Sequence, residues 1–74
     1  MDEINYKIIE NLGAISTKPS GWAKELNLIS WNDGEPKYDI RQWAPDHAKM
    51  GKGISLSREE AEELRTLLIK WLPR

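Results

Sequence analysis

The chain has 74 residues, with eleven Lys and Arg against twelve Asp and Glu, and its formal net charge is −1. This length predicts one small domain spanning residues 1–74, which hides only about 60% of the surface that its unfolded chain exposes. The absence of cysteine excludes disulfides and thiolate zinc sites, and a lone histidine excludes an imidazole cluster, so no metal or cofactor is expected. Self-association remains as a stabilising device for so small a core.

No apolar run approaches the roughly 20 residues that a membrane span needs. The N-terminus, Met1-Asp2-Glu3, is acidic and lacks the basic and then apolar order of a signal peptide. We therefore expect a cytoplasmic protein that does not bind membranes. A net charge near zero also indicates that any binding of nucleic acid depends on local basic positions and on stacking, because bulk positive charge is absent.

The first expected element is a strand over residues 4–16, in which apolar and polar positions are mixed. Its alternation up to Ile8 loses phase at Ile9, and such a shift inside a strand indicates a bulge or a strong bend. Residues 17–21 are rich in loop-forming types and predict a connection to the next strand.

The second expected strand runs from Trp22 to Trp31 and is followed by a hairpin turn over residues 32–36. Asp33-Gly34 is the strongest local turn signal in this segment. One face of the strand carries Trp22, Lys24, Leu26 and Leu28, and the other carries Ile29 and Trp31.

The third expected strand, Lys37 to Trp43, alternates cleanly. One side carries Tyr38 and Ile40, while the other carries Lys37, Asp39, Arg41 and Trp43. Because a buried face would not carry lysine, aspartate and arginine together, we interpret the strand as having an apolar side and a charged, aromatic side.

A polar loop over residues 44–53 and a short strand over residues 54–56 lead into a C-terminal helix. Ser57 and Glu60 have the spacing of a capping box, which predicts where the helix begins, and Pro73 ends it. The helix has one apolar stripe, made of Ala61, Leu64, Leu67, Leu68, Trp71 and Leu72. The element order predicts an α+β fold in which an antiparallel meander of four strands precedes one helix.

The aromatic residues suggest a binding site, because the chain has four Trp and two Tyr but no Phe. An aromatic ring can stack on any exposed base, and a neighbouring cation can hold a phosphate. Arg41 and Trp43 lie two residues apart on one strand face, about 6.8 Å by strand rise. Lys37 extends the same line, Trp31 precedes the turn, and Asp39 is expected to orient Arg41. The alternative is that both tryptophans lie at the edge of the core and that Arg41 is either solvated or part of a salt bridge.

A second candidate is the segment Lys49-Met50-Gly51-Lys52-Gly53, where glycines let the backbone approach a phosphate and lysines add charge. It lacks the spacing of a Walker A loop, and a flexible surface turn is the alternative interpretation. Lys24 and His47 are weaker candidates.

Two blocks, Tyr38–Trp43 (YDIRQW) and Gly51–Leu56 (GKGISL), precede the capped helix. Together they resemble the core of the single-stranded-DNA-binding transcriptional coactivator family (the positive-cofactor-four type). The similarity is closer to its bacterial branch, the YdbC-like proteins, and covers most of residues 21–60. The second block alone would be a weak signal, whereas both at this separation are specific.

The resemblance implies a four-stranded curved antiparallel sheet followed by one helix, forming a homodimer through the helices. It also implies sequence-independent binding of single-stranded DNA, with bases stacked on sheet aromatics and phosphates held by Lys and Arg. The DNA-binding residues are then expected to be Lys24, Trp31, Lys37, Arg41, Trp43, His47, Lys49, Lys52 and Gly53. The dimer interface is expected to contain Leu64, Leu67, Leu68 and Trp71, and the width of the helix stripe favours the same contact.

Other functions remain open at this point. His47 beside Asp46 is the single hint of catalysis, and no nucleophile accompanies it, so an enzyme is not expected. A protein-binding adaptor would also use Trp and Arg as anchor residues. A binder of single-stranded RNA would use the same stacking logic. Transcription, replication and repair are not distinguished by the sequence.

Overall fold

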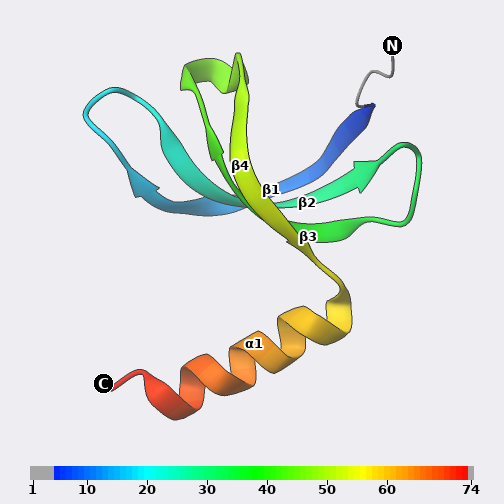
Figure 1. The fold of residues 1–74 in the computed structure, drawn as a ribbon, viewed down its shortest axis with the longest axis vertical. Helices are drawn as coiled ribbons and strands as arrows, with labels where there is room; N and C mark the ends of the chain where they lie inside the picture. The colour runs from blue at the N-terminus through cyan, green and yellow to red at the C-terminus, as the bar shows by residue number, and fades with distance from the viewer. Residues whose placement is uncertain (1–4, 74) are drawn as a thin grey trace.

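The computed structural model describes residues 5–73 and shows an α+β fold, as expected. Four strands pair as an antiparallel meander in the order β1-β2-β3-β4, and one helix follows (Figure 1). The elements are β1 (Tyr6–Thr17), β2 (Ala23–Trp31), β3 (Lys37–Trp43), the short 3-10 helix η1 (Pro45–His47), β4 (Met50–Leu56) and α1 (Arg58–Trp71). Ile4, which was expected to begin the first strand, lies outside the described residues.

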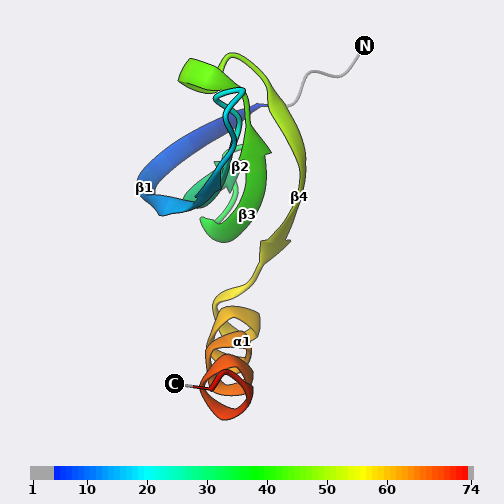
Figure 2. The same ribbon diagram turned by 90° about the vertical axis from the view of Figure 1, so that its left-hand side faces the viewer.

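Strand β1 is irregular where the sequence predicted a bulge. Its register with β2 shifts between Ile8 and Glu10, and two further shifts follow before the strand ends. Each shift places an extra residue on β1 and increases the local twist. The sheet is therefore strongly curved, and its strands curl around one face (Figure 2).

The hairpin turn between β2 and β3 forms where expected, but with different key residues. Asn32 and Asp33 adopt positive φ angles of 51° and 62°, and Gly34 N–H donates to the carbonyl of Trp31 at 2.8 Å. Gly34 itself does not have a positive φ. Asn and Asp tolerate the left-handed region because their short polar side chains bond locally, so the pair Asn32-Asp33 makes the turn.

Strand β4 is longer than expected, because it begins at Met50 and not at Ile54. Met50 pairs with Trp43 and Gly53 pairs with Arg41, so the glycine-containing segment belongs to the sheet. A side chain at position 53 has no room: its Cβ would meet the carbonyl oxygen of Ile40 and lie 2.6 Å from the Cβ of Arg41. Gly51 and Gly53 allow this close pairing, although the composition of residues 44–53 predicted a loop.

The most buried residues lie on one face of the sheet, which we call the inner face. It carries Ile29 and Trp43, exposed by 0% and 1%, and also Asn27 and Asp39, both fully buried. The expectation that the charged, aromatic side of β3 is not buried is wrong for Asp39 and Trp43. The curved sheet encloses this face. Hydrogen bonds from Arg41 and Ser55 offset the cost of burying the Asp39 carboxylate, so its charge does not prevent burial.

Helix α1 begins as predicted. Glu60 N–H donates to the hydroxyl of Ser57, and Ser57 N–H donates to the carboxylate of Glu60, at 3.1 and 2.8 Å. The helix extends away from its own sheet (Figures 1 and 2), and none of its side chains is buried. Among them, Leu67 and Trp71 are 44% and 72% exposed. Over residues 5–73, no helix is long and apolar enough to cross a membrane.

Candidate nucleic-acid interface

Arg41 is the best-fixed cation of the inner face. Its Nε and Nη2 donate to the two carboxylate oxygens of Asp39, each at 3.0 Å, and its Nη1 donates to the carbonyl of Gly51 at 3.0 Å. Ser55 Oγ donates to Asp39 Oδ2 at 2.9 Å. The bidentate geometry restrains the guanidinium plane, so Asp39 orients Arg41 as the sequence predicted.

The guanidinium lies over the indole ring of Trp31, with its central carbon 5.2 Å from the ring centroid. Such a contact is a cation–π interaction. Only one side of the guanidinium meets the ring. An open cavity of about 430 Å³ adjoins this pair, lined also by Lys37 and Met50. The arrangement therefore combines a flat cationic surface, a partly exposed aromatic ring and a second cation.

Trp43 is a core residue in this structure. Its ring is 1% exposed, stacks on the ring of His47 at 4.4 Å and contacts Tyr6 at 5.9 Å between centroids. Tyr6 also contacts Trp31 at 5.7 Å, so it joins the two tryptophans into one cluster. A base cannot reach the face of Trp43 in this conformation. Trp43 therefore lies in the core, as the alternative interpretation of the sequence had it.

His47 and Glu25 form a polar cluster at the other end of the inner face. His47 Nε2 lies 2.9 Å from Glu25 Oε1, and the same oxygen accepts from Asn11 Nδ2 at 3.0 Å and from Asn27 Nδ2 at 3.3 Å. Asp46 and His47 both have a φ of 57°, and this left-handed pair brings the imidazole against Trp43. His47 is thus held by two partners.

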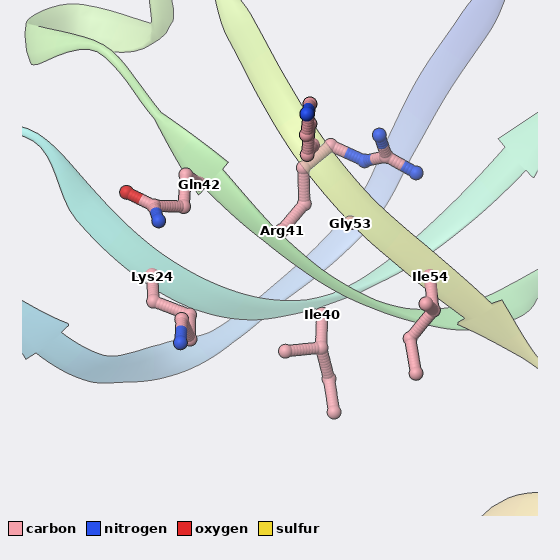
Figure 3. A pocket seen from close by; sticks show the side chains of 7 residues that line it. Lys24, Ile40, Arg41, Gln42, Gly53 and Ile54 are labelled. Atoms are coloured by element: carbon pink, nitrogen blue, oxygen red, sulfur yellow. The ribbon is translucent and has the colours of Figure 1, made fainter.

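The lysines expected at the site are spread over the sheet. Lys37 lines the cavity beside Arg41. Lys24 and Lys52 instead line a second cavity of about 390 Å³, to which Arg41 and Gly53 also contribute. The side chains of Lys24, Ile40 and Ile54 point toward the face of the sheet nearer α1, which we call the helix-side face, whereas Arg41 points away from it (Figure 3). Lys49 is exposed between η1 and β4, and its carbonyl accepts from Ala44 N–H at 2.9 Å. The expected residues are therefore brought together in part only.

Three residues of the inner face were missed by the sequence analysis: Glu25, Ser55 and Tyr6. Glu25 lies directly across from Arg41, and Ser55 directly across from Asp39. Both relationships depend on strand register, which the sequence pattern does not determine. Tyr6 lies in the alternating part of the first strand, but its aromatic partners come from β2 and β3, and no local signal links them.

Comparison with known proteins identifies a family and a bacterial relative. A family model described as Transcriptional Coactivator p15 (PC4) matches residues 18–67, which include β2, β3, β4 and most of α1. A protein of Treponema pallidum (strain Nichols), named only as uncharacterized, is 51% identical over 67 residues. That match covers 90% of this chain and 79% of the treponemal protein.

Proposed function

Because the chain belongs to the transcriptional coactivator p15 (PC4) family, a non-enzymatic family that binds single-stranded DNA and acts in transcription, we propose that its inner sheet face binds single-stranded DNA. The observation that carries this proposal is the cation–π pair of Arg41 and Trp31 beside an open cavity. We propose that binding has little regard to base sequence. Assignment to the bacterial YdbC-like branch stays a prediction.

The chemistry of the cation–π pair of Arg41 and Trp31 suits an unpaired base. A base can stack on the planar guanidinium or on the exposed part of the Trp31 ring, and each such stack contributes about 1–3 kcal/mol whatever the base. Because Asp39 and Gly51 already restrain the guanidinium, little side-chain entropy is lost when a base arrives. Stacking explains how a chain of net charge −1 can bind a polyanion.

Phosphates need cations beside the stacking surface. Lys37 lines the same cavity as Arg41 and is proposed as the first phosphate contact. Lys49 lies next to Met50, another lining residue, and is proposed as the second. Lys24 and Lys52 line the second cavity, and Lys24, on the helix-side face, would contact only a strand that passes around the sheet edge. We propose indirect roles for two other residues. Gly53 lets β4 approach Arg41 closely, and the ring of Trp43 holds the imidazole of His47 by stacking on it.

A second copy of the chain is proposed to cover the exposed apolar surface of α1. Leu64 is partly exposed, and Leu67, Leu68 and Trp71 are exposed by 44%, 45% and 72%, which is unusual for the apolar stripe of a helix. The helix-side face of the sheet is also open, and its Ile54 is 57% exposed. An isologous contact through these surfaces would bury both stripes at once and leave the two inner faces free.

A tryptophan-fluorescence titration tests the proposed function. Oligo-dT, oligo-U of equal length and a duplex are added at two salt concentrations. Saturable quenching by oligo-dT, a weak response to the duplex and moderate salt sensitivity are expected, because stacking contributes more than phosphate contacts. A stronger response to oligo-U would favour RNA as the ligand. The absence of any response at low salt would contradict nucleic-acid binding and favour the protein-binding adaptor.

A further inference from the structure

Glu25 is a carboxylate on the face proposed to receive a polyanion, and its environment fixes its orientation. The side chain is 15% exposed. One of its oxygens, Oε1, is contacted by nitrogen atoms of Asn11, Asn27 and His47, at 3.0, 3.3 and 2.9 Å. Asn11 also donates to Asn27 Oδ1 at 2.7 Å, which ties the two amides together. Oε1 is therefore held from three sides.

The other oxygen, Oε2, is left for a ligand. Within residues 5–73, the buried side-chain polar atoms that lack a partner are the indole nitrogens of Trp31 and Trp43. Oε2 has no hydrogen-bond partner among those residues and is not one of these buried atoms, so it reaches solvent. Glu25 thus presents one restrained acceptor oxygen beside the candidate site.

A fixed carboxylate oxygen discriminates between the parts of a nucleotide. It repels phosphate, and it accepts hydrogen bonds from donors on base edges, as acidic side chains do with the amino group of cytosine. Cytosine, adenine and guanine carry an amino group on the Watson–Crick edge. Thymine and uracil present one imide N–H between two carbonyl oxygens, and those oxygens repel a carboxylate.

We infer that Glu25 recognises the base edge of one bound nucleotide and favours a base with an exocyclic amino group at that position. The inference rests on the proposed function, because it needs a strand on the inner face. Glu25 precedes Trp31 by six positions on the curved strand β2, at most about 20 Å by strand rise, so a different nucleotide meets each residue. Glu25 also keeps phosphates away from this end of the face, which orients the strand.

The test compares oligodeoxycytidine with oligodeoxyuridine, because these bases differ only on the edge that meets Glu25. Competition titrations of equal-length oligomers are made at slightly alkaline pH, where oligodeoxycytidine stays unfolded. The wild-type chain is expected to bind oligodeoxycytidine about threefold to tenfold more tightly, as one partly solvated hydrogen bond to a charged group allows.

The variant Glu25→Gln makes the test specific. The amide nitrogens of Asn11 and Asn27 require an acceptor at Oε1, so the amide nitrogen of the glutamine takes the place of Oε2. The new donor suits the carbonyl of uracil, and the preference is expected to vanish or invert. Loss of the charge alone would tighten both complexes equally. Glu63→Gln on α1 removes the same charge elsewhere and is expected to keep the preference, and circular dichroism checks that both variants are folded.

The outcomes separate the inference from the proposed function. If the wild-type chain binds neither oligomer, the proposed function fails and the inference fails with it. If it binds both equally, or if Glu25→Gln keeps the wild-type ratio, the inference is overturned while single-strand binding stands. A changed ratio in Glu25→Gln with an unchanged ratio in Glu63→Gln supports the assignment.

Discussion

Arg41 and Glu25 are direct cross-strand partners in the register of β2 and β3, yet each forms its salt bridge with a different residue. Arg41 pairs with Asp39, two residues along its own strand, and Glu25 contacts His47 from η1. Opposite charges in this position usually pair with one another. Their separation divides the inner face into a cationic, aromatic half at Trp31 and a polar, acidic half at Glu25.

The first prediction concerns the guanidinium of Arg41. Arg41→Lys keeps the positive charge but loses the bidentate contact with Asp39 and the flat surface over Trp31. If bases stack there, the affinity for oligo-dT falls about tenfold, which is the contribution of one weak stack. The fluorescence titration measures this change, and thermal unfolding confirms that the variant is folded.

A matched substitution is available on the helix. Arg58 is 79% exposed on its side chain and pairs with Glu62 one turn along α1. Arg58→Lys makes the same chemical change far from the inner face and is expected to leave the affinity unchanged. Equal affinities for all three proteins would show that Arg41 acts as a simple charge, and stacking on it would have to be abandoned.

The second prediction distinguishes Trp31 from Trp43, which the sequence analysis placed in the same binding site. Trp43 is 1% exposed, so Trp43→Ala is expected to lower the free energy of unfolding by about 3–5 kcal/mol. Trp31 is partly exposed beside the cavity, so Trp31→Ala is expected to weaken oligo-dT binding by about 1–3 kcal/mol with a smaller loss of stability. Urea unfolding and the fluorescence titration measure the two effects. The reverse pattern would make Trp43 the stacking residue and Trp31 the core residue.

The sequence predicted the order and type of the strands and the helix. It did not predict which face of the sheet is enclosed or which residues lie opposite one another on neighbouring strands. The capping box at Ser57 and the phase shift in β1 are local signals, and both are confirmed. Alternation along β3 shows that Asp39 and Trp43 share a face, but it does not show which face the curved sheet encloses. Glu25 becomes visible as a site residue only when register places it opposite Arg41. Such facts depend on pairing between strands, which no local pattern contains.

The third prediction concerns α1 as a dimer interface. Trp71 is 72% exposed and lies on the apolar stripe, so Trp71→Glu adds a charge where a second copy is proposed to pack. Burying an unpaired carboxylate costs several kcal/mol, so the dimer is expected to dissociate at concentrations where the wild-type chain is paired.

Sedimentation velocity over a range of concentrations measures this change. Thr66 lies on the opposite side of α1, where its hydroxyl donates to the carbonyl of Glu62 at 3.1 Å. Thr66→Glu therefore adds the same charge outside the proposed interface and is expected to keep the dimer. A wild-type chain that sediments as a monomer at every concentration would refute the dimer. A Trp71→Glu variant that sediments like the wild-type dimer would instead remove Trp71 from the interface.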